Sequence, residues 1–373
     1  MNLLLLGFAF VLPYHVMRCA AAAGHRVVVL GNGPALDLVG SRYCDGFVES
    51  AFDYRSQDYE ILAEEITGLA ISHDFDLVIP SDDVSTRALA AIKDQLPIRT
   101  TPLPDVATFD TLNDKWNFAR CCEDHGVRVP ATRRYENAAA LRRDLTAGAI
   151  ALPLTVKPTN WSGGVGVMHI RTAHELALLD AVDYRPVLAQ QHIRGETVGV
   201  SVLCTGGKLT AHIVQQRTSR YFRVLDNPDL VANVARLMAA LGFDGVANFD
   251  AVVDRESGLG YLVECNPRLW YSVFPTMIAG LNFVAAAIDS AAGAPIARRT
   301  LPPIEIKLYT AGFRSLATPW RLSRTDWRML CYHLRDPAPF LHEHFQRFDD
   351  SDVAVRAMGD YIPLAAEAER RAS

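Results

Sequence analysis

Two neighbouring segments, VANFDAVV (246–253) and YLVECNPR (261–268), decide how this chain folds. Each alternates apolar with polar residues, which is the pattern of a strand with one buried face. The segment between them, DRESGLG (254–260), is rich in residues that form turns. The sequence therefore predicts a β-hairpin, and we assume that it is symmetrical about Ser257.

The polar residues of this hairpin indicate a metal site. Alternation places Asn248 and Asp250 on one face of the first strand, and Glu264 and Asn266 on one face of the second. The symmetrical register puts the two carboxylates opposite each other, whereas a slip of two residues makes them diagonal. Carboxylates about 5 Å apart repel by roughly 3 kcal/mol at an effective dielectric of about 20, so a cation must offset them. Oxygen ligands select Mg²⁺ or Mn²⁺ over zinc, and Arg268 adds a fixed positive charge. The alternative is a solvated hairpin with surface acids, which its apolar neighbours disfavour.

A lysine followed by a glycine-rich turn indicates a phosphate site. In PLTVKP (153–158), Lys157 projects from the face opposite the apolar residues, and SGGVGV (162–167) follows. Backbone N–H groups of such a turn approach phosphate oxygens closely, and the lysine supplies a point charge. The turn lacks the ending of a Walker loop. An ordinary glycine-rich hairpin is the alternative.

The first hundred residues predict a parallel sheet. Apolar runs at 3–6, 26–30 and 75–80 alternate with helical stretches at 16–24, 56–70 and 84–92. The loop after the first run lacks the GxGxxG pattern, which disfavours a dinucleotide-dependent oxidoreductase. Ser81, Asp82 and Asp83 follow a strand at the carboxyl end of this sheet, where ligands usually lie. The acids are predicted either to bind a substrate ammonium or to cap the next helix.

The rest of the chain reads as mixed α and β structure. A linker at 98–105 leads to a helix over 113–125, and an apolar helix is predicted over 275–292. Short strands interrupted by helices are expected at 153–158, 167–170, 187–193, 197–204, 209–216, 246–253 and 260–267. Residues 301–373 are predicted to form a small helical appendage.

Composition excludes several classes of protein. The chain has 373 residues, of which 50% are hydrophobic and 21% charged, with a net charge of −5. It contains no basic run, so nucleic acid is not an expected partner. It contains no long uncharged apolar stretch, so no membrane association is expected. The seven scattered cysteines suit reduced thiols, so a cytoplasmic protein is expected.

Taken in order along the chain, these motifs resemble the ATP-grasp superfamily, in particular its carboxylate–amine ligases and its carbamoyl-phosphate-synthase and biotin-carboxylase branch. The resemblance covers about residues 105–290. The segments that carry it are DKWNFARCCEDHGVRVPAT (114–132), PLTVKPTNWSGGVGV (153–167), VLAQQHIRGE (187–196), GFDGVANFDAVV (242–253) and YLVECNPRLW (261–270).

The resemblance implies a domain order. A Rossmann-like N-terminal domain over 1–108 precedes a two-lobed ATP-grasp fold, and the helical appendage follows over 301–373. The first ATP-grasp lobe spans 109–187 and carries the glycine-rich lid. The second lobe spans 188–300 and carries the metal site. The fold class is therefore α/β followed by α+β.

The resemblance also implies the ATP-binding residues. Lys115 and Lys157 hold the phosphates, and Glu196 contacts the ribose, unless Thr197 takes that place. A flexible lid is formed by Ser162, Gly163, Gly164 and Gly166. The adenine hinge consists of Gln190, Gln191, His192 and Ile193, with backbone groups of Gln191 and Ile193 reading the base.

The metal and reaction site is implied in the same way. Asp250, Glu264 and Asn266 bind two Mg²⁺ or Mn²⁺ ions, while Arg268 and Arg217 stabilise the transferring phosphoryl group. The family often has glutamate where this chain has Gln190 and Asp250. The bicarbonate-binding pattern of biotin carboxylase is not evident, which disfavours a carboxylase.

Substrate contacts are less constrained by the motifs. Arg220 and Arg223, in RTSRYFR (217–223), are predicted either to clamp a substrate carboxylate or to lie in a solvated loop. Tyr271 either walls the substrate pocket or belongs to the core, and Trp270 is predicted to be core.

The resemblance implies an enzyme that phosphorylates a carboxylate with ATP and couples the acyl phosphate to an amine, releasing ADP and phosphate. Its expected partners are small-molecule carboxylates and amines, and a homodimer is left open. The alternatives are a thiol nucleophile, carbamoyl-phosphate-type chemistry or a non-catalytic nucleotide-binding module. The lysines and carboxylates disfavour the last, because all of them are present.

Overall fold

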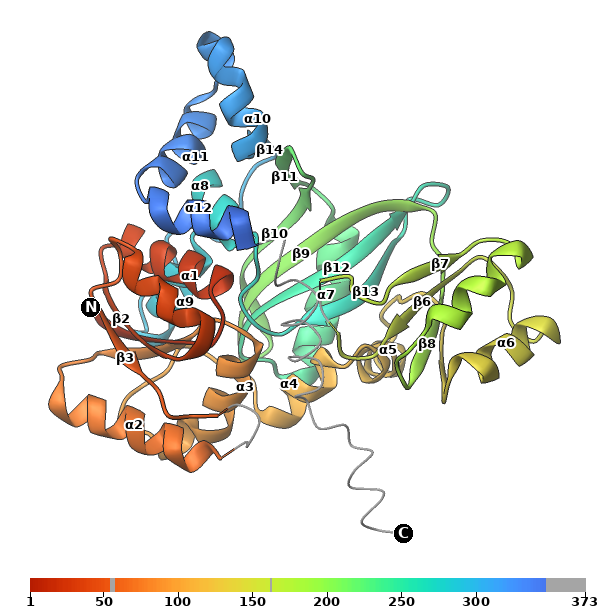
Figure 1. The fold of residues 1–373 in the computed structure, drawn as a ribbon, viewed down its shortest axis with the longest axis horizontal. Coiled ribbons are helices and arrows are strands. Elements are labelled where there is room, and N and C mark those ends of the chain that lie inside the picture. The colour runs from red at the N-terminus through yellow and green to blue at the C-terminus, as the bar shows by residue number, and fades with distance from the viewer. Residues whose placement is uncertain (54–57, 162, 347–373) are drawn as a thin grey trace. The chain divides into compact units, whose positions relative to one another are not determined.

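The computed structural model describes residues 1–53, 58–161 and 163–346 (Figure 1). The described chain forms two compact units. Unit 1 comprises Met1–Phe109, Val198–Asp250 and Asn266–Gln346, and unit 2 comprises Asp110–Thr197 and Ala251–Cys265.

The N-terminal part of unit 1 is a four-stranded parallel sheet, as predicted. Its strand order is β3-β2-β1-β4, and its interior is formed by apolar residues such as Leu3, Leu5 and Val29. The strands are β1 (Asn2–Gly7), β2 (Arg26–Gly31), β3 (Gly46–Glu49) and β4 (Leu77–Pro80). The helices are α1 (Val11–Ala22), α2 (Tyr59–Ser72) and α3 (Asp83–Ile92). Helix α1 begins earlier than the predicted helical stretch at 16–24. Pro13 lies in its first turn, where the missing N–H costs no hydrogen bond, so the helix includes this proline.

A six-stranded sheet has the order β13-β12-β9-β10-β11-β14. Its strands are β9 (Gly195–Thr205), β10 (Lys208–Arg217), β11 (Tyr221–Leu225), β12 (Gly245–Asp254), β13 (Gly260–Asn266) and β14 (Ile304–Lys307). Helix α7 (Pro228–Leu241) precedes β12 and buries Leu230, Val234 and Leu237. Strand β14 was not predicted, because it is short and lies in a segment whose composition suggested helices.

The turn between β12 and β13 corrects the assumed register. Asp254 N donates to Leu259 O over 2.9 Å, whereas symmetry about Ser257 would place Asp254 opposite Gly260. Gly258, in the left-handed conformation at φ 71°, donates to Asp254 O and shortens the turn by one residue. The assumption of a hairpin symmetrical about Ser257 is therefore wrong.

Burial along β13 also departs from strict alternation. Leu262 and Cys265, three residues apart, are both buried, while Val263 and Glu264 between them are half-buried. A regular strand would bury every second residue. The position of Glu264 opposite Asp250 consequently stays a prediction.

Unit 2 contains an antiparallel four-stranded sheet of order β5-β8-β6-β7. Its strands are β5 (Thr132–Tyr135), β6 (Leu154–Pro158), β7 (Met168–Ile170) and β8 (Val187–Gln191). The helices of this unit are α5 (Lys115–Asp124) and α6 (Ala138–Thr146), with a 3₁₀ helix at Ala173–Ala181. Leu141 and Val156 are completely buried in its core.

One predicted helix is confirmed and another is divided in the structure. The helix predicted over 113–125 is preceded by α4 (Val106–Asn113), and Asp114 separates the two by capping α5. The helix predicted over 275–292 consists of α8 (Val273–Ala279) and α9 (Phe283–Ala291). Gly280 ends α8 in a left-handed conformation at φ 119°, and the side chain of Asn282 caps α9. Apolar periodicity alone did not detect the break between α8 and α9.

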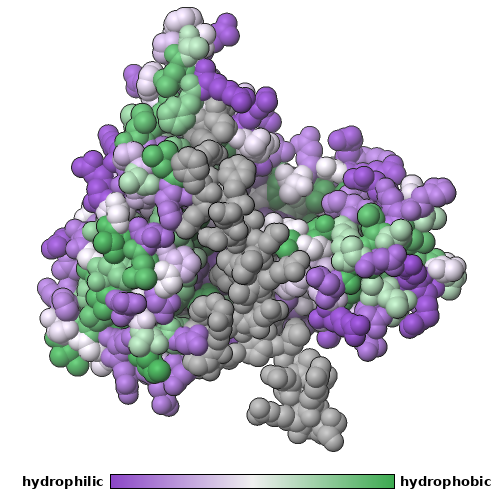
Figure 2. Space-filling model, viewed as in Figure 1, coloured by the Kyte–Doolittle hydropathy of each residue, from purple (hydrophilic) through white to green (hydrophobic). Residues whose placement is uncertain are grey.

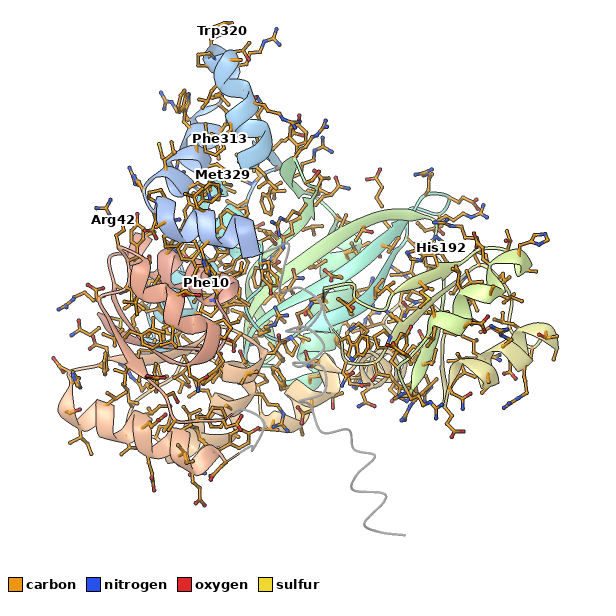
Figure 3. The ribbon with its side chains drawn as sticks, viewed as in Figure 1. Phe10, Arg42, His192, Phe313, Trp320 and Met329 are labelled. Carbon is orange, nitrogen blue, oxygen red and sulfur yellow. The ribbon has the colours of Figure 1, made fainter. Side chains whose placement is uncertain are left out.

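The C-terminal segment is helical where the structure describes it. Trp320, which is 78% exposed, lies at the tip of this segment (Figure 3). It contains α10 (Tyr309–Arg314), α11 (Arg324–Leu334) and α12 (Pro337–Gln346). The predicted appendage beyond residue 346 lies outside the described residues.

Hydrophilic and hydrophobic residues are interspersed over the surface seen in Figure 2. Among the described residues, none of the helices is long and apolar enough to cross a membrane alone. The consecutive pair α8 and α9 meets the length and composition required, but it is bent by 90°.

The loop after β4 depends on one buried carboxylate. Asp82 is 2% exposed and accepts hydrogen bonds from Phe8 N and Ser85 N, both over 2.8 Å. Asp82→Ala should lower the free energy of unfolding by about 2–3 kcal/mol, because it removes a helix cap and leaves a second buried N–H unpaired. Urea denaturation measures this loss.

Asn227→Ala is the matched control, since Asn227 caps α7 of the same unit through a single bond to Leu230 N. Its cost should be about 1 kcal/mol. Equal losses in the two variants would contradict the dual role of Asp82.

Candidate functional site

Two lysines of unit 2 are buried. Lys115 is 8% exposed and Lys157 is 2% exposed. Lys115 begins α5 because Asp114 caps the helix, accepting hydrogen bonds from Trp116 N and Asn117 N. Lysine is rarely buried to this extent unless it is paired. A solvated surface position is therefore excluded for both residues.

Both ammonium groups reach the same segment of β13. Lys115 Nζ donates to Trp161 O over 2.6 Å and lies 3.4 Å from Glu264 Oε2. Lys157 Nζ donates to Val263 O over 3.4 Å. Two positive charges thus lie at the Val263–Glu264 segment of β13. Ammonium groups at one place suit an anionic ligand such as a polyphosphate.

The glycine-rich turn after β6 requires its glycines. Gly163, Gly164 and Gly166 have φ of 70°, 77° and 72°, a conformation that other residues rarely adopt. Tyr184 Oη donates to Gly166 O over 2.7 Å and fastens the end of the turn, whereas a Cβ at Gly164 would meet no atom within 4 Å. Ser162 lies outside the described residues. The predicted movement of this lid stays a prediction.

The end of β8 differs in part from the predicted adenine hinge. Gln191 N donates to Ala131 O over 2.8 Å, so this N–H is already occupied, and reading of the base by another backbone group of Gln191 stays a prediction. The Gln190 side chain is 3% exposed and donates to Thr132 Oγ1. Sequence reasoning missed both partners, because they lie on β5 or just before it, far away in the chain.

His192 and Ile193 follow β8, and Figure 3 shows His192 at its place in this unit. The His192 ring lies 3.2 Å from Thr155 Oγ1 and 5.0 Å from the His169 ring. Burial and this neighbouring ring lower the pKa of His192. Glu196 lies on the first, exposed part of β9.

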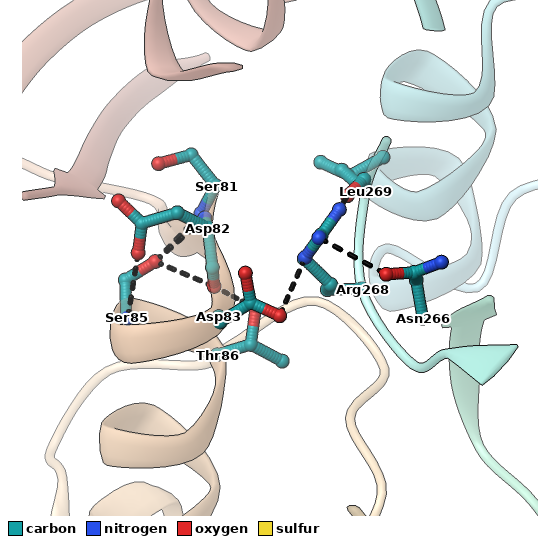
Figure 4. Close-up of polar contacts among 8 residues, drawn as sticks. All are labelled: Ser81, Asp82, Asp83, Ser85, Thr86, Asn266, Arg268 and Leu269. Carbon is teal, nitrogen blue, oxygen red and sulfur yellow. Dashed lines mark hydrogen bonds and ion pairs between the residues drawn. The ribbon is translucent and has the colours of Figure 1, made fainter. Parts of the chain in front are cut away.

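Arg268 of unit 1 is held by an ion pair that the sequence did not reveal (Figure 4). Its guanidinium is 5% exposed, and Nε lies 2.7 Å from Asp83 Oδ1. It also donates to Leu269 O over 2.8 Å and to Asn266 Oδ1 over 3.1 Å. Desolvation opposes the charge, but Asp83 together with Tyr271 and Asp82 outweighs it, and the pKa of Arg268 is raised. Arg268 is therefore a permanent cation tied to Asn266.

The predicted ammonium site at residues 81–83 is corrected by these contacts. Ser81 Oγ donates to Leu6 O, and Asp82 is the helix cap already described, so both side chains are occupied within the fold. Asp83 pairs with Arg268. The capping alternative is confirmed for Asp82. Asp83 forms an ion pair instead, a role that the sequence did not predict.

The basic segment after β10 is only partly available to a substrate. Arg223 pairs with Glu305 of β14 over 2.5 Å, so the predicted clamp would have to break this exposed ion pair. Arg217 ends β10 and Arg220 lies in the following turn, both exposed. Tyr271 is 48% exposed, whereas Trp270 is buried as predicted.

The predicted metal ligands of unit 1 are embedded in hydrogen bonds. Asp250 Oδ1 accepts from Asn248 Nδ2 over 3.2 Å, and Asn266 Oδ1 accepts from Arg268. Within the described residues, no three His, Cys, Asp or Glu side chains form a metal cluster. A set made of Asp250, Asn266 and Glu264 has only carboxylate and amide oxygens. This chemistry fits Mg²⁺ or Mn²⁺, which also take oxygens from water and phosphate.

Comparisons with known proteins agree with these features. Residues 183–310 match the family model described as ATP-grasp in the biosynthetic pathway with Ter operon. No curated protein matches the sequence.

Solved structures share the fold at low sequence identity. N5-carboxyaminoimidazole synthetase from Staphylococcus aureus is 13% identical, with 85% of each chain covered and a TM-score of 0.64. The biotin carboxylase domain of 2-oxoglutarate carboxylase from Hydrogenobacter thermophilus is 18% identical, with 80% of this chain and 71% of that chain covered and a TM-score of 0.61. L-amino acid ligase from Bacillus licheniformis is 18% identical, with 78% and 73% covered and a TM-score of 0.56. Residues 183–310 thus match an ATP-grasp family by sequence, and the chain shares the fold of these solved structures.

Proposed function

We propose that this protein is an ATP-dependent ligase that phosphorylates a substrate carboxylate and couples the acyl phosphate to an amine. The observation that carries the proposal is the convergence of buried Lys115 and Lys157 on β13 beside Glu264. Two ammonium groups held at one place attract an anion with several negative oxygens. ATP phosphates supply that anion.

The residues have separate tasks in this proposal. Lys115 and Lys157 neutralise the phosphates, and the turn containing Gly163, Gly164 and Gly166 lies over them. Asp250, Glu264 and Asn266 hold Mg²⁺ or Mn²⁺, which when bound neutralises phosphate charge and aligns the reacting oxygens. Arg268, kept charged by Asp83, stabilises the phosphoryl group during transfer.

The reaction itself balances without a protein nucleophile. A carboxylate oxygen attacks the γ-phosphorus, the bond to the β–γ bridging oxygen breaks, and ADP leaves. The amine then attacks the acyl carbon, phosphate departs, and the amine loses a proton. Cys265 is 3% exposed and half-buried Glu264 and Asn266 flank it, which supports its exclusion as a nucleophile.

Bicarbonate is the second candidate for the carboxylate. The biotin carboxylase domain that shares this fold is described in complex with MgADP and bicarbonate. The first step is the same, with carboxyphosphate as the product. Release of ADP with bicarbonate alone, compared with amino acids singly and in pairs, separates the two candidates.

The predicted metal ligands can be tested by charge removal. Asp250→Asn or Glu264→Gln should each lower turnover by at least about 100-fold, since each removes a charge that holds the ion at the phosphates. Both variants should keep their unfolding midpoints. Near-normal turnover in both would reject the metal assignment.

The two lysines should govern nucleotide affinity. Lys115→Ala and Lys157→Ala should each weaken ATP binding by about tenfold or more, measured by calorimetry with Mg²⁺. Lys157→Arg should not restore binding fully, because a planar fork replaces a compact charge poorly. Lys208→Ala, an exposed lysine of β10, is the control and should bind normally. Unchanged affinity in both test variants would refute the phosphate site.

The products distinguish the acyl-phosphate path from other routes. ADP and phosphate should form, and a carboxylate labelled with ¹⁸O should transfer one label to phosphate, because that oxygen bridges the intermediate. Cys265→Ala should retain most of its activity and lose only about 1 kcal/mol of stability. AMP as a product, or unlabelled phosphate, would exclude this mechanism.

A further inference from the structure

A chain of buried polar side chains leads through unit 1 to Asp250. Ser272 Oγ donates to Gln215 Oε1 over 3.1 Å, and Gln215 Nε2 lies 3.2 Å from Asn248 Oδ1. Asn248 Nδ2 in turn donates to Asp250 Oδ1 over 3.2 Å. Ser201 braces the middle of the chain, since its hydroxyl donates to Asn248 Oδ1 over 2.8 Å and accepts from Gln215 Nε2 over 2.6 Å.

Burying these polar side chains costs the fold some stability. Ser201 is completely buried, Gln215 is 4% exposed and Asn248 is 7% exposed. An apolar core would accept aliphatic residues at these positions without hydrogen-bond requirements. Gly199 leaves room for the group, because a Cβ there would lie 3.3 Å from both Asn248 Oδ1 and Gln215 Cγ. Ser272 precedes α8, yet its hydroxyl bonds to Gln215 and makes no capping bond to the helix.

The Asp250 carboxylate determines which group donates and which accepts in every hydrogen bond of this side-chain network. An ionised Asp250 can only accept, so Asn248 must turn its amide nitrogen toward it. The Asn248 oxygen then faces Ser201 and Gln215, which must both donate. Gln215 therefore turns its own oxygen toward Ser272. Reversing any amide would set two donors or two acceptors against each other, so only this arrangement satisfies all the groups.

We infer that Asn248 and Gln215 are positioning residues that hold the Asp250 carboxylate in the orientation required for a divalent cation. The inference rests on the proposed function, in which Asp250 is a metal ligand. A bond to one carboxylate oxygen restricts rotation about the Cβ–Cγ bond and so preorganises the other oxygen. Through Ser272, the network also connects Asp250 to the loop that follows Asn266 and Arg268.

The test is direct Mn²⁺ binding in the presence of ADP, measured by calorimetry, together with unfolding midpoints. Asn248→Ala should weaken Mn²⁺ affinity by about 10- to 100-fold, the usual effect of losing a partner of a metal ligand. Gln215→Met, which keeps the length of the side chain, should weaken it by a smaller factor in the same direction. ADP affinity without metal should not change in either variant.

Asn233→Ala is the matched control. Asn233 is 4% exposed in the same unit and donates to Asp229 O over 3.0 Å, apart from the network. Its variant should lose stability and keep the Mn²⁺ affinity of the wild type. An equal loss of Mn²⁺ affinity in Asn233→Ala would overturn the inference.

Asp250→Asn separates this inference from the proposed function. If Asp250→Asn abolishes Mn²⁺ binding while Asn248→Ala and Gln215→Met bind it normally, the positioning role is rejected and the metal site stands. If Asp250→Asn binds Mn²⁺ normally, the metal assignment fails, and the inference fails with it. Ser272→Ala removes one hydroxyl at the far end of the network and should give the smallest loss; a loss larger than that of Asn248→Ala would contradict the proposed order.

Discussion

Burial of the Arg268 guanidinium constrains much of unit 1. A charge that is 5% exposed requires a partner of opposite sign, and Asp83 supplies it from the first turn of α3. The N-terminal parallel sheet is thereby tied to the Asn-Pro-Arg segment, which is far away in the chain. Asp82 fixes the same loop, because it joins the start of α3 to Phe8 after β1. The position of Arg268 depends on both adjacent acids.

Unit 2 also buries positively charged side chains, but their surroundings differ from those of Arg268. Lys115 and Lys157 are buried and both reach the Val263–Glu264 segment of β13, so two positive charges lie at one place. Two positive charges at one place favour an anion with several negative oxygens. Unit 1 therefore holds its cation beside Asp83, whereas the proposed role of the two cations in unit 2 is to bind a ligand.

The proposed chemistry needs little from the protein beyond charge and position. Phosphoryl transfer requires aligned oxygens and neutralised charge, and both come from groups already fixed by hydrogen bonds. The role inferred for the polar network behind Asp250 is of the same kind, because a carboxylate held in one orientation loses less freedom when it binds a cation. Low identity to every structural neighbour reported means that the shared fold does not determine the substrate.

The sequence by itself determined the elements and the chemical types. Period-two and helical patterns predicted the parallel sheet and most strands, and the residue types of Lys157, Glu264 and Asn266 predicted a phosphate and metal chemistry, because both signals depend on near neighbours in the chain. The sequence did not reveal the turn register around Gly258 or the break at Gly280, where one glycine changes the backbone without altering the hydrophobic pattern. Only the tertiary structure decided which side chains are partners: Asp83 with Arg268, Gln190 with Thr132, and Ser272 with Gln215. Partners of this kind are brought together by packing of distant strands and helices, and no local pattern records that packing.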